Sequence, residues 1–338
     1  MNLKSLYIYS LIFTLGLLTV SCEEEVIDIR MHGNDGEYQM HAIVNTADTL
    51  SCISIRRVQG YVTKPVTNAE VDILVNGALR QTISNADCDT SDGRYLFMPN
   101  FNVGDNIQFI ARADGNVLKA TANCLQALDI VSVDTVYYTT YYSDSYSFNN
   151  YRTYIKIKKP KTNKWDSHYY RLDVFTIDDY IVDCDADFNY DTYEYTYIYK
   201  HAIKQGSYYS HTNDLALNNG NIEDGEDILP FLEQTSNRFG VFTDDFFDGD
   251  TYTLVVDVPC NTDWENEILC RVSTISADEY NFLRSVSSMP IADMESINCE
   301  PIMRSNVTGG MGFVAVESAA VFSLKKSPHF NPYKVPYM

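Results

Sequence analysis

The stretch that decides the fold is Arg57-Val-Gln-Gly-Tyr-Val-Thr-Lys-Pro-Val-Thr-Asn-Ala-Glu-Val-Asp-Ile-Leu-Val-Asn-Gly-Ala78. Within it Val71, Ile73 and Val75 alternate with the residues between them, and Asn-Gly follows directly. An alternation with a period of two is typical of a strand that buries one face, and Asn-Gly is a frequent hairpin turn. The stretch therefore predicts strand, turn and strand.

The same pattern recurs after this stretch. Residues 91–99 and 103–115 each combine a Gly-bearing turn with a short apolar run. Four or five short strands spaced by turn signals are typical of a small β-sandwich. We predict that residues 50–128 form this sandwich, and that residues 22–49 are a tether leading into a first strand.

The remaining chain also favours strands. It opens with the Tyr-rich residues 131–142, and residues 152–158, 169–177 and 238–258 contain further strand patterns. One helix is expected from Ser276 to Pro290, because Ser276 and Glu279 form a capping box and the proline ends the helix. Tyr280, Leu283 and Val286 then share one face, which should pack on a sheet. The fold class is therefore mainly β, with a larger β-rich domain over residues 129–326, one or two short helices, and a tail at 327–338.

Short motifs connect the first domain with a known family. Gly60, Pro65-Val66, Ala69-Glu70-Val71 and Asp92-Gly93-Arg94-Tyr95 occur in an order that resembles Ig-like carboxypeptidase-regulatory-like sandwich domains. In that family the domain is a structural spacer without catalytic residues, and the resemblance implies the same here.

The N-terminus predicts export. An uncharged apolar run from Leu6 to Val20 has the length of a signal peptide and is shorter than the roughly 20 residues of a spanning helix. We assign residues 1–21 to a signal peptide. Ser21-Cys22 resembles the bacterial lipobox, which implies lipidation of Cys22 and anchoring in the outer membrane, surface-exposed or facing the periplasm. The usual lipobox has Leu at the position of Thr19, so the alternative is cleavage elsewhere, with Cys22 an ordinary thiol.

Composition narrows the classes of partner. The net charge is -21, and Tyr (26) and Phe (16) far outnumber Trp (2). Such an acidic chain is repelled by phosphate backbones, so we expect no nucleic-acid partner.

The cysteines give little sign of a metal site. Besides Cys22 there are seven cysteines, which are widely spaced and form no Cys-x-x-Cys motif, and this argues against a zinc site. Cys260 and Cys270 are the candidate disulfide, because they would close a loop of hairpin size.

The C-terminal region contains Ser305-Asn306, Gly309-Gly310, Gly312 and Phe313. These residues resemble the closing motif of an uncharacterised Bacteroidetes lipoprotein family, the domain of unknown function 4249, although Glu300-Pro301 departs from its usual Asn-Pro. That family has no established activity, and its members resemble accessory proteins of TonB-dependent outer-membrane receptors. From the residues alone, the glycines predict a backbone turn with positive φ between strands.

Two candidate contact sites stand out. Asp183, Asp185 and Asp187 follow part of a calcium-loop pattern, but the Gly of such a loop is missing, so a solvated acidic segment is the favoured interpretation and no metal is assigned. Tyr193, Tyr195, Tyr197 and Tyr199 alternate and would line one face of a strand. Exposed, they would contact a partner protein or a glycan; ordinary half-buried packing is the alternative.

No catalytic motif is present in the sequence. The six histidines form no His-x-His or His-Glu-x-x-His spacing, and no Gly-x-Ser-x-Gly occurs. We therefore expect no enzyme and no cofactor, but a binding or accessory module for a TonB-dependent envelope receptor. A glycan-active or other hydrolytic surface enzyme and a purely structural surface component are the alternatives.

Overall fold

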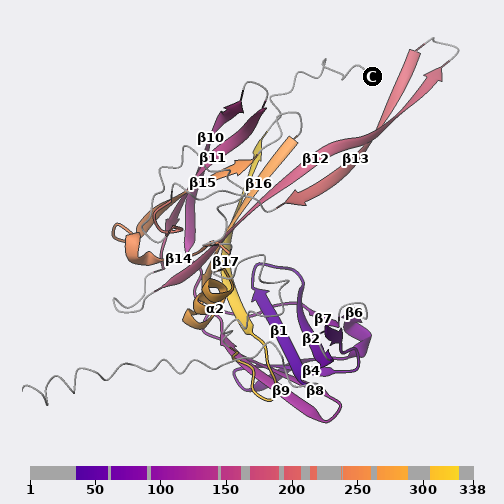
Figure 1. Ribbon diagram of the computed structural model, residues 1–338, viewed down its shortest axis with the longest axis vertical. Coiled ribbons are helices and arrows are strands. Elements are labelled where there is room, and N and C mark those ends of the chain that lie inside the picture. Colours follow the sequence, from indigo (N-terminus) through magenta and orange to yellow (C-terminus); the bar gives the residue numbers. More distant parts are fainter. Residues whose placement is uncertain are drawn as a thin grey trace, which may run out of the picture.

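The computed structural model confirms a mainly β fold, built from two β-sandwiches that share a strand (Figure 1). It describes residues 36–59, 62–89, 93–143, 146–160, 168–189, 194–206, 214–218, 237, 239–259, 265–287 and 305–326. Within this part of the chain, no helix is both long and apolar enough to cross a bilayer.

The first sandwich packs two sheets around one core. One layer contains β1 (Tyr38–Asn45), β2 (Ser51–Gln59), β3 (Val62–Pro65), β6 (Cys88–Asp89) and β7 (Arg94–Phe97). The other has the order β5 (Ala78–Ile83), β4 (Glu70–Val75), β8 (Asn106–Ala113) and β9 (Asn116–Asn123). A single turn of 3-10 helix, η1 (Asn85–Asp87), precedes β6.

The alternation predicted for residues 71–75 is confirmed in β4, where side chains of one face are buried. Val71 and Ile73 are buried in the shared core, and Asn76 and Gly77 form the β4–β5 turn with φ of 52° and 80°. The side chain of Tyr95 is fully buried. Its hydroxyl donates to the Val66 carbonyl and accepts from the Ala69 N–H, at 2.8 Å each. These bonds fix the β3–β4 connection and leave no polar atom of that ring unpaired.

The second sandwich begins with β10, which starts at the predicted domain boundary. Its smaller sheet has the order β10 (Asp129–Ser143), β11 (Tyr146–Lys158) and β15 (Thr251–Pro259). The facing layer contains β13 (Glu194–Gly206), β12 (Tyr169–Asn189), β16 (Glu265–Ile275) and β17 (Val314–Lys326), and β14 (Val241–Thr243) pairs with β12. The 3-10 turn η2 (Asp244–Phe246) follows β14.

Strand β17 runs through both sandwiches. It pairs in parallel with β1, from Ala42 with Val314 to Asn45 with Glu317, and then antiparallel with β16. Val314 and Val316 are buried in the first core, whereas Phe322 packs against the second. The first unit therefore extends beyond the predicted residues 50–128 and includes β1 and the C-terminal residues 305–316.

The glycines before β17 allow this segment to lie between β1 and β9. Gly309 and Gly312 have the expected positive φ, 83° and 126°. A Cβ at Gly309 would overlap the carbonyl oxygen of Val117, and one at Gly312 would overlap that of Met40. The glycines thus serve close backbone approach as well as the turn, because any side chain would separate the strands.

Helix α2 (Ala277–Ser287) is the predicted helix. The Ser276 hydroxyl accepts the Glu279 N–H at 3.1 Å, which is the N-cap half of the predicted capping box, whereas the buried carboxyl oxygens of Glu279 have no hydrogen-bond partner among the described residues. Leu283 is buried with Val241 and Ile275, and Phe282 stacks on Phe313 with ring centroids 4.3 Å apart. The helix thereby covers the outer face of the sheet where β12, β16 and β17 meet.

A two-stranded arm extends from the second sandwich. The pairing of β12 with β16 ends at Asp179 and Glu265, while its pairing with β13 continues to Asn189 and Glu194. Residues 180–189 and 194–202, called the arm below, thus continue past the sheet for about 30 Å at the rise of a strand. Figure 1 shows this hairpin projecting beyond the rest of the molecule.

Candidate functional site

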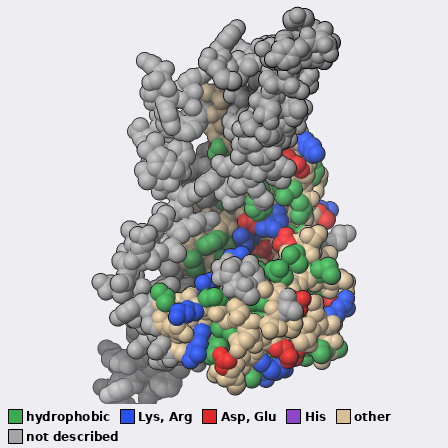
Figure 2. Space-filling model, turned by 90° about the vertical axis from the view of Figure 1, so that its right-hand side faces the viewer, with side chains coloured by type: hydrophobic (Ala, Val, Ile, Leu, Met, Phe, Trp, Pro, Cys, Tyr) green, Lys and Arg blue, Asp and Glu red, His purple; other side chains and the backbone are tan. Residues whose placement is uncertain are grey.

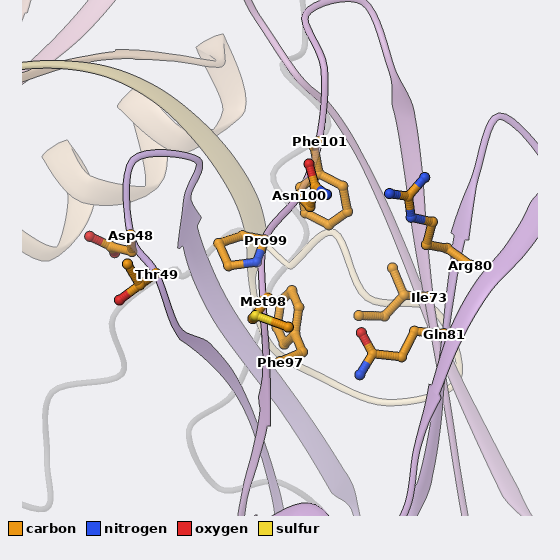
Figure 3. A pocket seen from close by; sticks show the side chains of 10 residues that line it. All are labelled: Asp48, Thr49, Ile73, Arg80, Gln81, Phe97, Met98, Pro99, Asn100 and Phe101. Atoms are coloured by element: carbon orange, nitrogen blue, oxygen red, sulfur yellow. The ribbon is translucent and has the colours of Figure 1, made fainter.

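A pocket of about 550 Å³ lies at one end of the first sandwich. Ile73 of β4 and Phe97 of β7 come from opposite sheets, and Phe101 lies in the loop after β7 (Figure 3). Ring centroids of Phe97 and Phe101 are 6.4 Å apart, and both rings contact Phe109 in the core. The floor of the pocket is therefore apolar and held in place by the core of the sandwich.

A β-bulge in β5 shapes one wall. Gln81 is paired with Ile73 and Leu79 with Leu74, so Arg80 is an extra residue on β5. A bulge places two residues opposite one and changes the direction of a side chain, whereas neighbours on a regular strand point to opposite faces. In Figure 3 the side chains of Arg80 and Gln81 both extend toward the aromatic floor.

The opposite wall contains Asp48 and Thr49, from the turn between β1 and β2. Asp48 accepts an ion pair from Arg271 of β16, 3.2 Å away. Partial burial raises the pKa of Asp48, and the charge of Arg271 offsets only part of that effect. This carboxylate therefore connects the pocket wall with a charged network on the second sandwich.

That network lies on the outer face of the sheet, beside α2. Arg271 binds Asp173 at 3.0 Å, Arg171 binds Asp173 at 3.1 Å, and Arg171 binds Glu317 at 2.8 Å. The Asn45 amide donates to Glu317 at 2.9 Å. On the face shown in Figure 2, acidic and basic side chains lie close together at mid-height of the molecule. Positive and negative charges alternate along this network, which points to a structural role, although Nε of Arg171 has no hydrogen-bond partner among the described residues.

Two buried carboxyl groups meet at the end of this network. Burial and the nearby charge of Glu317 raise the pKa of Glu279 well above its ordinary value. Burial would also raise the pKa of Glu317, but the charge of Arg171 and its hydrogen bond to Glu317 at 2.8 Å hold this pKa below the usual value. Of the two carboxyl groups, Glu279 thus holds a proton more readily than an ordinary glutamate, and Glu317 favours its charged form.

The predicted contact residues lie mainly on the arm. Tyr193 lies outside the described residues; the backbone register pairs Tyr195 with Phe188, Tyr197 with Ala186 and Tyr199 with Cys184. The backbone of Asp183, Asp185 and Asp187 belongs to β12 and forms a strand rather than a loop. No group of three or more metal-ligating side chains occurs among the residues that the structure describes.

The sequence predicted lipidation of Cys22 and a disulfide between Cys260 and Cys270. Cys22 lies outside the described residues, as does Cys260. Cys270 is a free thiol, fully buried in the middle of β16, so the structure does not contain the predicted Cys260–Cys270 disulfide. Its side chain points into the second core, where burial raises its pKa to about 12. Cys270 is therefore a small apolar core residue.

Sequence reasoning did not find Arg80, Gln81 or the burial of Glu279. A bulge depends on the partner strand, and nothing in Ala78-Leu-Arg-Gln-Thr-Ile83 marks one. Asn76-Gly77 was the only local signal near the pocket, since it fixes the hairpin that carries Arg80.

The fold and the pocket define a two-sandwich β protein with an apolar-floored pocket. The model of a family described as a domain of unknown function (DUF4249) matches residues 24–322. The chain belongs to this family, as its C-terminal motif indicated. No curated protein matches the chain.

Proposed function

We propose that this chain is a lipid-anchored outer-membrane lipoprotein that acts as a binding and accessory module for a TonB-dependent envelope receptor. The predicted signal peptide and Cys22 support the location, and the resemblance of the C-terminal motif supports the partner. The observation that carries the proposal is the arm. It extends away from both cores, as an element that contacts a second protein would.

The arm is suited to a partner by its backbone. Beyond Asp179 no described strand other than β13 pairs with β12, and no described strand pairs with the outer edge of β13. Open edges present unpaired N–H and C=O groups, and an isolated two-stranded hairpin is only marginally stable in water. A partner that pairs with or covers the arm would stabilise it.

The register gives the arm two unlike faces. Alternate residues share a face of a strand, so Tyr195, Tyr197 and Tyr199 lie at positions of one face, and Asp183, Asp185 and Asp187 at positions of the other. Tyrosine is enriched in protein interfaces because it combines a large apolar area with a hydroxyl. The tyrosine face is therefore the proposed receptor contact.

The test is capture of the tagged, lipidated protein from gently solubilised outer membranes, followed by mass spectrometry. We expect specific recovery of one receptor barrel, and loss of that barrel when Tyr195, Tyr197 and Tyr199 are replaced by serine. The matched control replaces Asp183, Asp185 and Asp187 by serine and should retain the barrel.

Recovery of no barrel, under conditions in which known receptor complexes survive, would overturn the accessory role and make glycan binding the next property to screen. Loss of the barrel from the aspartate control alone would place the contact on the acidic face. A Cys22→Ser variant should leave the membrane fraction; retention there would overturn the lipid anchor.

A further inference from the structure

We propose that the pocket of the first sandwich binds a short apolar peptide by its free C-terminal carboxylate. This ligand site is separate from the arm, which belongs to the second sandwich, so the inference goes beyond the receptor contact and does not depend on it. Three features of the pocket carry it: an available cation, an apolar floor, and amide and backbone groups at the wall.

The cation is Arg80. Its side chain is exposed, and the described residues offer it no ion pair. Asp105 lies near enough for the charge of Arg80 to act on its carboxylate. That carboxylate, however, already accepts hydrogen bonds from the Asn102 N–H and the Asn76 amide, at 2.8 Å each. Across the pocket, Asp48 is paired with Arg271. In a chain with a net charge of -21, an arginine available at an apolar pocket is a specific feature, and its planar fork matches a carboxylate.

The floor determines what accompanies the carboxylate. Ile73 and Phe97 are almost fully buried, and Phe101 is half-buried between them and the solvent. Met98 is 71% exposed at the rim, where a flexible side chain can adjust to a ligand. The volume of about 550 Å³ falls within the usual range of small-ligand pockets, so one or two apolar side chains are the expected contents.

A peptide fits the wall better than a fatty acid does. Gln81 and Asn100 present amides that can bond to peptide groups (Figure 3). Strand β5 is the edge of its sheet, and no described strand pairs with its outer backbone groups, where a further extended chain could add. Addition of a peptide strand to a sheet edge is a common mode of recognition. An alkyl chain would form no hydrogen bond with any of these polar groups.

The experiment is isothermal titration of the full mature protein with three probes: N-acetyl-Leu-Phe with a free carboxylate, the same peptide as its C-terminal amide, and decanoate. We expect the free acid to bind at least tenfold more tightly than either of the other two. Arg80→Met should remove this preference, and the exposed control Lys64→Met should keep it. Phe101→Ala should weaken acid and amide by the same factor, since it removes floor contacts alone.

Equal affinity for acid and amide, or no binding of either at millimolar concentration, would overturn the proposal. Decanoate binding as tightly as the peptide acid would overturn the assignment to peptides. The result is distinguishable from the receptor test: Arg80→Met should still capture the barrel, and the tyrosine-to-serine arm variant should still bind the peptide acid.

Discussion

Glu279 has two functions at the first turn of α2. Its backbone N–H completes the cap with Ser276, and its fully buried side chain faces Glu317 and Arg171. Burial and the negative charge of Glu317 favour the protonated form of this carboxyl group and raise its pKa. The docking of α2 on the sheet is thereby coupled to one proton.

This coupling predicts how stability depends on pH. The folded pKa of Glu279 lies above the unfolded one, so its contribution is complete at low pH and is lost as pH rises from about 4.5 toward the folded pKa. Each unit of difference corresponds to about 1.4 kcal/mol. Glu279→Gln should therefore show a smaller fall in the free energy of unfolding between about pH 5 and pH 8 than the wild type.

Urea denaturation across this range measures the slope. The control Glu70→Gln removes an exposed carboxylate on β4 and should leave the slope unchanged. Equal slopes for Glu279→Gln and the wild type would show that Glu279 is ionised in the folded protein.

At the residue scale, the sequence predicted features that depend on neighbours in the chain, but not features that depend on residues far away in the sequence. The cap of Ser276 and the positive φ of Gly309 and Gly312 depend on neighbours in the chain, and each was expected from the sequence. The burial of Glu279 depends on Arg171 and Glu317, which approach only in the folded sheet. A capping glutamate looks the same in sequence whether its side chain is buried or exposed.

At the element scale, strand alternation predicted most of the sheets because one face of each strand is buried and the other is not. Residues 71–75 are an example, with Val71 and Ile73 in the core. The bulge at Arg80 and the length of the arm were not predictable, since both depend on where a neighbouring strand pairs or ends. The tyrosines of β13 alternate in sequence whether or not a third strand accompanies them.

The arm should contribute little to the stability of the body. If residues 182–200 are replaced by Asn-Gly, a hairpin turn should join Ile181 to His201, which are already paired. We expect the melting temperature to change by less than about 2 °C, which corresponds to under ~1 kcal/mol. Circular dichroism measures it, and a large decrease would show that the arm supports the sheet.

At the scale of the whole molecule, the two predicted domains are connected more closely than their sequences suggest. β10 begins at Asp129, but β17 adds a strand to both sandwiches, because it lies between β16 and β1 in one continuous sheet. The parallel pairing of β1 with β17 joins residues from opposite ends of the chain. Local periodicity carries no information about such a pairing, which is why the first unit was expected to end before the second began.

This shared strand predicts that the sandwiches unfold together. Val316→Ala removes apolar contacts in the first core only. If the sheet is one cooperative unit, amide hydrogen exchange should speed up by a similar factor in β2 and in β12. The control Val321→Ala, at an exposed position of the same strand, should leave both unchanged. Faster exchange confined to β2 would show two independent units.

The place of β17 in the chain also orders events during synthesis. A ribosome makes β1 well before β17, so the first sandwich emerges with β1 lacking its parallel partner and with an incomplete core. Unpaired edges of this kind invite aggregation until their partner strand arrives. A chain that ends before Val314 lacks β17 in both sandwiches. We therefore expect proteases to degrade the whole truncated chain, with neither sandwich surviving as a folded fragment.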